Sequence, residues 1–218
     1  MKKLYGDGIH DDYPYIQAQL DSGVCEVFLP APKVNYVISK TLQIHSNQTL
    51  KLPRMAIIKL AKMSNCAMVE NVDFEKWETN ICLDGGIWDM NHNNQWPNPY
   101  HFPDSNGVIR TKAYMKEKFG WTPQSGLVRP TYTGHAFVFS RVKNFTFKNV
   151  TIVNPVVYGV QLSFIEYFTI ENIRVRVIIY FISKQLYTSC LPVLLCDVTI
   201  PGEKPMAVKS GFQVTSEG

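Results

Sequence analysis

The feature that most constrains the fold is a pattern of eleven residues that occurs twice. The first copy is VKNFTFKNVTI, residues 142–152, and the second is IEYFTIENIRV, residues 165–175, which begins 23 positions later. Apolar and polar residues alternate along much of both copies, and Phe, Thr, Ile and Val favour extended chain. The pattern therefore predicts two strands with the same buried face. Since one such turn of chain cannot bury its apolar face alone, we expect successive turns to stack.

The spacing of the copies selects the type of stack. A repeat of this length in strands, without helical periodicity, fits a parallel β-helix better than a leucine-rich or ankyrin array. The similarity extends backwards, so that residues 137–152 align with residues 160–175. A weaker third copy, LLCDVTI at residues 194–200, places Asp197 in line with Asn172. We therefore expect an all-β chain that forms a right-handed parallel β-helix, a solenoid.

Asn149 falls on Asn172 when the two copies are aligned. An asparagine at the same place in successive turns can hydrogen-bond to the copies above and below it, and it tolerates left-handed backbone angles. We therefore predict an asparagine ladder at this corner. A competing interpretation is that the Asn-x-Ser/Thr sites at Asn47, Asn144 and Asn149 carry sugars, which requires a eukaryotic secretory route.

One short helix is predicted near the start of the chain. Asp11 or Asp12 can cap it, and Pro14 follows where a first helical turn tolerates proline. Ile16 and Leu20 then form an apolar stripe before a Ser-Gly pair ends the helix. Because a solenoid needs cover over its open end, we expect this helix to cap the stack.

Length and composition bound the domain organisation. A chain of 218 residues is expected to form a single domain, and residues 91–133, with five prolines, predict an irregular insertion into the stack. The formal net charge of +4 is small and the lysines are scattered, so nucleic acid is not expected as a partner. No stretch approaches the roughly 18 apolar residues of a membrane-spanning helix, so no membrane partner is expected.

Cysteine spacing and the N-terminal sequence limit the chemistry and the compartment. The five cysteines, which lie at irregular distances without a Cys-x-x-Cys pair, are Cys25, Cys66, Cys82, Cys190 and Cys196. This spacing argues against a zinc site and a dense disulfide framework and predicts buried thiols, and we expect neither a metal ion nor a cofactor. The start, MKKLYGDGIHDDYP, has no apolar segment after its lysines. Either the chain is intracellular or a secretion signal has been removed.

Four phrases, in this order, resemble the pectate-lyase-like β-helix superfamily. YGDGIHDDYPYIQAQLDSG resembles its opening segment, which leads into a capping helix, and EVFLPAPKVNYVISKTLQIHSNQTLKL resembles the strands that follow. LDGGIWDMNHNNQW is similar to a Gly-Asp-Gly stretch with a nearby Trp in polygalacturonases, the glycoside hydrolases of family 28. FSRVKNFTFKNVTIVNPVVYGVQLSFIEYFTIENIRV resembles the next two turns in that family. The resemblance covers residues 5–175 and is closest to the N-terminal part of family 28.

This resemblance implies an inverting hydrolase of galacturonate polysaccharides, in which two carboxyl groups stand roughly 6.5–9.5 Å apart. In that family the carboxyl groups come from an Asn-Thr-Asp stretch and an Asp-Asp pair, followed by Gly-His-Gly and Arg-Ile-Lys motifs. None of these motifs follows residue 173, where the only acids are Asp197, Glu203 and Glu217. The catalytic residues stay unknown, and we expect the domain, residues 1–218, to be incomplete at its C-terminal end.

Two motifs are similar to parts of this machinery but carry other interpretations. Asp11-Asp12 is a paired carboxylate that we expect to belong to the start of the helix. Gly134-His135-Ala136 is similar to Gly-His-Gly, but it precedes the repeat instead of following it.

Substrate contact is predicted from a cluster of aromatic and planar polar side chains, which are suited to carbohydrate. The cluster consists of Trp88, Asp89, His92, Trp96 and Tyr100. An alternative interpretation is that Trp88 packs beside a Gly-Gly corner and that Trp96 anchors the insertion.

The predicted function is that of a glycoside hydrolase-like β-helix that acts on or binds a pectin-type polysaccharide. One alternative is a calcium-dependent lyase, to which Asp84, Asp89 and Asp104 could contribute ligands. Another is a non-catalytic binding or structural β-helix like a phage tailspike. The resemblance implies a polysaccharide partner and an extracellular or periplasmic location. An open end of the stack would also favour self-association through unpaired strand edges.

Overall fold

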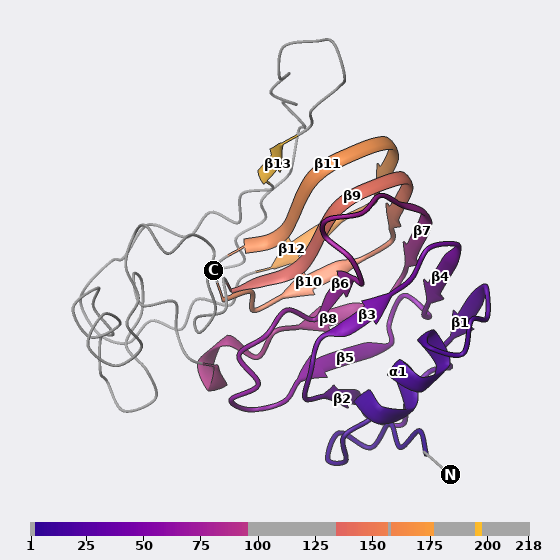
Figure 1. Ribbon diagram of the computed structural model, residues 1–218. Coiled ribbons are helices and arrows are strands. Elements are labelled where there is room, and N and C mark those ends of the chain that lie inside the picture. The colour runs from indigo at the N-terminus through magenta and orange to yellow at the C-terminus, as the bar shows by residue number, and fades with distance from the viewer. Residues whose placement is uncertain (1–2, 96–133, 157, 177–194, 198–218) are drawn as a thin grey trace, which may run out of the picture.

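The computed structural model describes residues 3–95, 134–156, 158–176 and 195–197. These residues form parallel strands in two sheets, with one short α-helix near the start of the chain (Figure 1). In chain order the elements are α1 (Tyr13–Leu20), β1 (Glu26–Phe28), β2 (Tyr36–Ile38), β3 (Leu42–Ile44), β4 (Gln48–Lys51), β5 (Ile57–Leu60), β6 (Val69–Asn71), β7 (Glu78–Asp84), β8 (Ile87–Asp89), the 3-10 helix η1 (His92–Asn94), β9 (His135–Lys148), β10 (Thr151–Val153), β11 (Tyr158–Glu171), β12 (Arg174–Arg176) and β13 (Leu195–Asp197).

The strands fall into three columns, which we call A, B and C. Column A is a five-stranded sheet in the order β12-β10-β8-β5-β2. The other sheet contains column B, where β3 pairs with β6 and β6 with β9, and column C, where the order is β1-β4-β7-β9-β11. The start of β9 pairs with β6 and its end with β7, so this long strand passes through both columns. The chain thus visits A, B and C in turn, and we call each such passage a rung.

The pairing of β9 with β11 and of β10 with β12 confirms the repeat. Val142 lies beside Ile165 in column C, and Ile152 lies beside Val175 in column A. The members of each pair are 23 residues apart in the sequence. Parallel pairing in this register places like side chains above one another, so the inward positions of both copies meet in the core.

The third copy does not follow the predicted alignment. β13 pairs with the first half of β11, so Asp197 lies beside Ser163 instead of Asn172. The similarity rests on the short phrase Asp-Val-Thr-Ile, which is too brief to fix the register of a strand.

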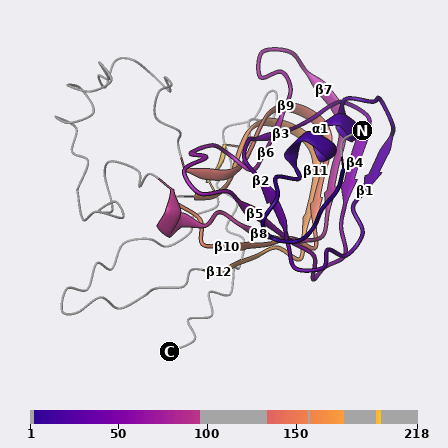
Figure 2. The same ribbon diagram turned by 90° about the horizontal axis from the view of Figure 1, so that it is seen from below.

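Inward side chains from the three columns form one core. The ring of Trp88 lies 5.2 Å from that of Phe137, Phe137 lies 5.1 Å from Phe147, and Phe139 lies 4.6 Å from Phe145. All five are at most 1% exposed, and burial of one such side chain contributes about 2–3 kcal/mol. Because these rings come from all three columns, their contacts join the sheets across the core. Figure 2 shows the two sheets from below, with the strands of each stacked on one another.

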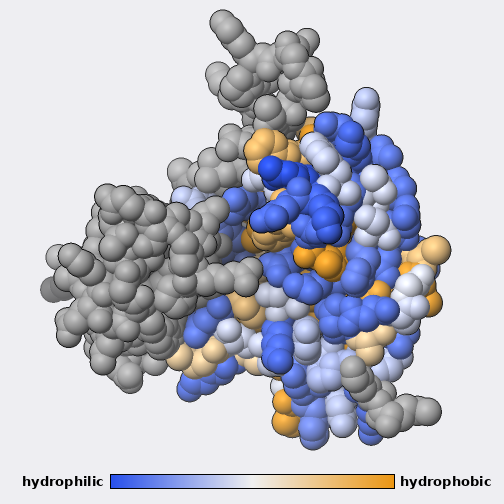
Figure 3. All heavy atoms as spheres, in the orientation of Figure 1, coloured by the Kyte–Doolittle hydropathy of each residue, from blue (hydrophilic) through white to orange (hydrophobic). Residues whose placement is uncertain are grey.

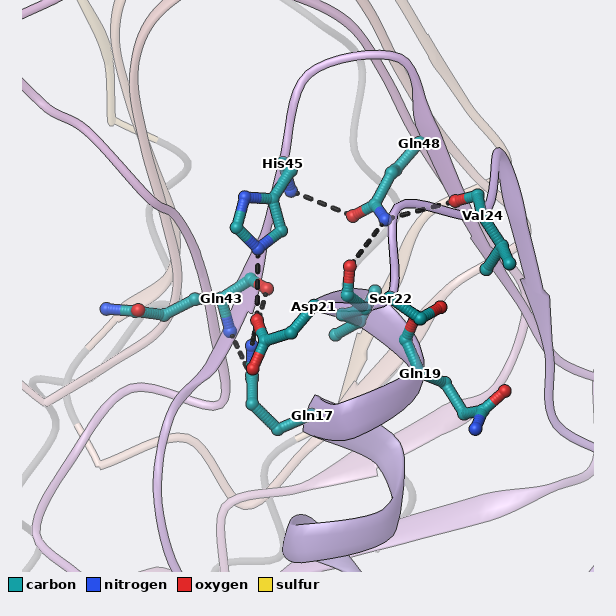
Figure 4. Close-up of polar contacts among 9 residues, drawn as sticks. Gln17, Gln19, Asp21, Ser22, Val24, Gln43, His45 and Gln48 are labelled. Carbon is teal, nitrogen blue, oxygen red and sulfur yellow. Dashed lines mark hydrogen bonds and ion pairs between the residues drawn. The ribbon is translucent and has the colours of Figure 1, made fainter.

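Helix α1 lies beside β3 and caps the stack, as the sequence predicts. Ile16 and Leu20 are fully buried. Gln17 continues the strand pairing with its side chain: Oε1 accepts a hydrogen bond from the backbone N–H of Gln43 at 2.9 Å, and Nε2 donates to the Gln43 carbonyl at 3.1 Å (Figure 4). One carboxamide therefore satisfies backbone groups that the edge of β3 would otherwise leave unpaired.

A second glutamine closes the C-terminal end of the helix. Gln48 Nε2 donates hydrogen bonds to the carbonyls of Leu20 at 2.7 Å and Val24 at 3.0 Å, while its Oε1 accepts from the backbone N–H of His45 at 3.0 Å (Figure 4). The last carbonyls of a helix have no partner within it, so this side chain supplies the missing donor.

The two aspartates before the helix, either of which was predicted to cap it, have different roles. Asp11 Oδ1 accepts from the backbone N–H of Tyr13 at 3.0 Å, which is part of the helix start. Asp12 makes no side-chain bond to the helix; its fully buried carboxylate accepts from the N–H of Tyr5 at 2.6 Å and of Val37 at 3.1 Å. Asp12 thus joins the N-terminal segment to column A, which a helix pattern cannot reveal because its partners are not helical.

Asparagines on successive rungs form hydrogen-bonded ladders. Between columns C and A, Asn172 Nδ2 donates to Asn149 Oδ1 at 2.9 Å, as predicted. Between columns B and C, Asn144 donates to Asn80 at 3.0 Å and Asn80 to Asn47 at 2.7 Å. All of these residues have positive φ angles, between 54° and 61°. Asparagine adopts this left-handed conformation more readily than other residues with a side chain, so the ladders also fix the corners.

The ladders bear on the alternative that these asparagines carry sugars. The side-chain nitrogen of Asn144 donates to Asn80, and that of Asn149 donates to Asp84 at 2.8 Å. A glycan would be attached to these same nitrogens and would disturb both bonds. The structure therefore favours the ladder at these two sites.

The cysteines are only partly as predicted. Cys66 and Cys82 are partly buried, and burial raises the pKa of both thiols. Cys25 is exposed, so the prediction of a buried thiol is wrong there. Cys190 and most of the predicted insertion, residues 96–133, lie outside the described residues. None of the helices in the described part of the chain has the length and apolar character needed to span a membrane.

The first strand position after the undescribed segment 96–133 is a buried histidine. His135 is 8% exposed, and its ring stacks on that of Tyr158 with 4.9 Å between the centroids. Burial lowers its pKa from 6.5 to about 4, because the charged imidazolium is poorly solvated there. His135 is therefore neutral near pH 7.

We expect the replacement Gly85→Ala to destabilise the protein by about 3 kcal/mol or more. Gly85 has a φ of +94°, and an added Cβ would overlap the carbonyl oxygen of Leu52. Gly23→Ala is the matched control, since Gly23 has a φ of +78° but nothing lies within 4 Å of its added Cβ. It should cost only about 1 kcal/mol of backbone strain. Urea unfolding of both variants checks this, and equal losses would contradict the close packing at Gly85.

We expect His135→Gln to weaken the pH dependence of stability between pH 7 and pH 4.5. The unfolded chain binds a proton below its ordinary histidine pKa of 6.5, whereas the native histidine does so only near pH 4. Stability supplied by neutral His135 is thus present above pH 6.5 and is lost as the pH falls, by on the order of 2 kcal/mol. Urea unfolding across this range should show a wild-type slope that the variant lacks. A constant difference between the two proteins at every pH would refute the assignment.

Candidate functional site

The structure places two of the predicted site residues, Trp88 and Asp89, on opposite faces of β8. Trp88 lies in the core and is fully buried, and its indole N–H donates to the carbonyl of Gly85 at 3.0 Å. Trp88 is therefore out of reach of a polysaccharide on the outer surface. The alternative interpretation, in which Trp88 packs beside the Gly-Gly corner, agrees with this position. The reason is strand alternation: Trp88 occupies the inward position of β8, while Asp89 faces outward.

Asp89 lies on the outer face of column A and is held by several donors. Its Oδ1 accepts from the backbone N–H of Asn91 at 2.7 Å and from Nδ2 of Asn154 at 2.9 Å. Its Oδ2 lies 3.9 Å from Nζ of Lys59, and the aspartate side chain is 16% exposed. These contacts fix the carboxylate at the end of β8, where a small part of the side chain stays exposed.

Cationic side chains follow the same register line. Lys59 pairs with Asp89, Asp89 pairs with Val153, and Val153 pairs with Arg176, so these residues lie beside one another on four neighbouring strands. Arg176 is exposed. The line therefore presents positive charge on both sides of one carboxylate.

His92 lies in η1, shortly after Asp89 in the chain. Its imidazole is half-buried, and this burial lowers its pKa, although the negative charge of Asp89 acts in the opposite direction. Asn91, with a φ of 54°, turns the chain between them, and its Nδ2 donates to the carbonyl of Leu60 at 3.0 Å. Asp89 and His92 are thus brought to the same end of column A. Trp96 and Tyr100 lie outside the described residues.

The acidic residues that the sequence analysis considered, Asp11 and Asp12 as a paired carboxylate and Asp84 as a calcium ligand, have structural partners. Asp11 and Asp12 bond to backbone N–H groups at the start of the chain. Asp84 accepts from Asn149 and lies 3.6 Å from Nζ of Lys148. His135 is buried in column B, so the motif Gly134-His135-Ala136 supplies a core side chain. Among the described residues no group of three or more His, Cys, Asp or Glu is placed to hold a metal ion.

Sequence reasoning did not find Lys59 and Asn154 as contacts of Asp89, or Arg176 as a member of the same register line. The repeat of 23 residues links β10 to β12, but Asp89 and Asn154 are separated by the long undescribed segment. That segment hides the periodicity, so only the strand register reveals the contact. For Lys59 an available signal was its place between the buried Ile58 and Leu60 in β5.

Comparison with known proteins concerns the fold. No family model matches the chain, and none of the curated proteins matches it in sequence. A family 28 exopolygalacturonase from Yersinia enterocolitica has a TM-score of 0.59 at 16% identity, over 81% of this chain and 38% of that chain. The A-module of the mannuronan C-5 epimerase AlgE4 from Azotobacter vinelandii has a TM-score of 0.55 at 15% identity, over 81% of this chain and 50% of that chain. PfbA, a surface adhesin of Streptococcus pneumoniae, has a TM-score of 0.55 at 21% identity, over 80% and 37% respectively.

These identities are too low to transfer an activity, and the chain spans half or less of each of these three proteins. The similarity in structure shows how the strands are arranged. The described part of the chain shares the parallel-strand fold of these three proteins, in agreement with the stacked parallel strands that the sequence predicts.

Proposed function

We propose that this chain is a polysaccharide-binding β-helix of the glycoside hydrolase type, and that its ligand is a pectin-type galacturonate polymer. In this proposal the three columns are the walls of a right-handed parallel β-helix. The single observation that carries it is the line of Lys59, Asp89 and Arg176 across column A. Cations on both sides of a fixed carboxylate suit an anionic sugar chain, because the cations can meet its carboxylates while the aspartate accepts its hydroxyl groups.

The remaining predicted contacts fit around this line. His92 lies at the same end of column A as Asp89, and its lowered pKa keeps the imidazole neutral, so that it can donate or accept a hydrogen bond. Trp96 and Tyr100 follow η1 closely in the sequence, and we propose that they supply aromatic faces for the sugar rings.

We propose binding rather than cleavage by the described residues. Inversion requires a protonated acid and a separate carboxylate that activates water. Asp89 contacts Lys59 and amide donors, and Asp84 contacts Lys148 and Asn149, so both carboxylates already have partners within the protein. Galacturonan hydrolysis remains the activity that the family resemblance suggests, with its acid and base not assigned.

Two other functions rest on weaker support. A calcium-dependent lyase needs several acidic oxygens around one ion, and among the described residues no such group of His, Cys, Asp or Glu occurs. Asp104, a candidate ligand, lies outside them. A non-catalytic surface module finds support in the similarity to PfbA, a surface adhesin, and with it an extracellular or periplasmic location.

Self-association is a further proposal, based on the end of the stack formed by β11 and β12. Phe168 is 38% exposed, whereas Phe145 and Ile81, its counterparts on the two preceding rungs, are fully buried. Within the described residues no strand lies beyond β12 in column A. We propose that a second copy covers this apolar end. Phe168→Ser should lower the dimer fraction in analytical ultracentrifugation, and an unchanged sedimentation profile would count against it.

We expect the chain to bind polygalacturonate and not neutral dextran, measured as retardation in gels that contain each polymer. The double variant Lys59→Met with Arg176→Met should weaken binding about tenfold, since two charge-assisted contacts are lost. Lys33→Met, at an exposed lysine in the loop between β1 and β2, is the control and should bind normally.

The same samples separate the enzymatic alternatives. New reducing ends without ultraviolet absorbance would show hydrolysis, and absorbance from an unsaturated product would show a lyase. Binding without either product is the expected result. If the double variant binds as tightly as the wild type, column A is not the binding site.

A further inference from the structure

An exposed aromatic surface lies at the corner between columns B and C, away from the outer face of column A. The residue pairs Glu78–Val142 and Val142–Ile165 are in register, so the residues that precede them, Trp77, Arg141 and Phe164, also follow one another on three rungs. Their rungs meet where β9 and β11 bend beside the start of β7 (Figure 1). We call this set, together with Lys143 and Tyr167, the corner surface.

The aromatic side chains of the corner surface are accessible. Trp77 is 45% exposed, Phe164 is 43% exposed and Tyr167 is 79% exposed. Where its residues are coloured, the face of the molecule in Figure 3 is predominantly hydrophilic, with hydrophobic residues in small groups. Aromatic rings gathered on an otherwise polar surface are typical of binding sites.

Cations lie against two of these rings. The guanidinium carbon of Arg141 lies 4.6 Å from the centroid of Phe164, and Nζ of Lys143 lies 4.8 Å from that of Trp77. Contacts of this kind hold flat side chains in place, which lowers the entropy that a ligand must remove. The corner surface is therefore ordered before a ligand arrives.

The two cations differ in their partners. Lys143 forms an ion pair with Glu166, whose carboxylate lies 3.0 Å away. Arg141 donates to the carbonyl of Phe74 at 3.2 Å, and no carboxylate among the described residues forms an ion pair with it. Within the described part of the chain, the positive charge of Arg141 is thus not neutralised by a carboxylate.

The backbone conformation of Tyr167 at this corner costs free energy. Tyr167 continues the line of the Asn47, Asn80 and Asn144 ladder, because the residues that follow Asn80, Asn144 and Tyr167 are paired in register. It has a φ of 53°, a conformation that suits asparagine and disfavours tyrosine. Tyrosine also cannot continue the amide ladder. A residue that breaks the local rule at such a cost indicates a role other than stability.

We propose that the corner surface is a second binding site, and that its ligand is an anionic carbohydrate chain. Sugar rings present apolar faces that stack on Trp77 and Tyr167, and a carboxylate or sulfate on the chain pairs with Arg141. Successive rungs are about 4.8 Å apart, so a chain that runs along the stack meets one side chain on each rung. The class of ligand rests on the proposed function, but the surface is separate from column A.

The variant Tyr167→Asn gives the sharpest test. It replaces an exposed ring by the residue that the ladder uses on the three preceding rungs. We expect the melting temperature to stay the same or to rise, while binding to polygalacturonate falls about tenfold in the gel assay. Loss of stability together with binding would show that Tyr167 has a structural role and would overturn the proposal.

A second variant and a control extend this test. Trp77→Ala should weaken binding by a similar factor, whereas Phe28→Ala, at a phenylalanine 54% exposed on β1, should not. Binding of a neutral dextran should be absent for all of them. A preference of the wild type for an acidic peptide such as polyglutamate over polygalacturonate would overturn the carbohydrate assignment.

The two proposed sites fail in different ways. If the column A variants lose binding and the corner variants keep it, this inference is wrong and the proposed function stands. If only the corner variants lose binding, the corner surface is the site and column A is not. Additive losses in combined variants support both.

Discussion

In-register stacking of the rungs is the constraint on which the rest of the structure depends. Parallel pairing places each residue above its counterpart on the preceding rung, and a slip by one residue would turn every inward side chain outward. Two kinds of side chain hold the register. Inward residues such as Ile81 and Phe145 stack on one another behind paired strands, while Asn80 and Asn144 bond to one another at the corners. The outward residues are free of this demand, and the proposed ligand contacts on the strands of column A, Lys59, Asp89 and Arg176, lie among them.

Much of the fold could be predicted from the sequence, because stacking leaves a periodic record. The match of residues 142–152 with residues 165–175 gave the register of two rungs, and the Asn149–Asn172 bond followed from it. The capping helix could also be predicted from its local pattern. The third copy could not be placed, since few residues supported it. The pattern also could not choose between Asp11 and Asp12 as the helix cap, because the partners of Asp12, such as Val37, lie in other elements.

The candidate site was less predictable than the fold. Adjacent residues of a strand face opposite sides, so a cluster defined by proximity in sequence mixed the buried Trp88 with the outward Asp89. The contacts of Asp89 with Lys59 and Asn154 cross strands that are distant in the chain. Similar solved structures include a hydrolase, an epimerase and an adhesin, so the fold by itself does not choose among functions. Only the side chains on the outer faces can do so.

The carboxamide of Gln17 gives the stack a direction. By pairing with both backbone groups of Gln43, it closes the edge of β3 at the helical end, and no further strand can add there. In the proposed self-association, a second copy would therefore meet the opposite end of the stack. Two copies that meet through their β12 ends would face each other and leave a helix at each extremity, which is a closed pair with twofold symmetry. By closing the edge of β3, the side chain of Gln17 disfavours head-to-tail addition of another copy at column B.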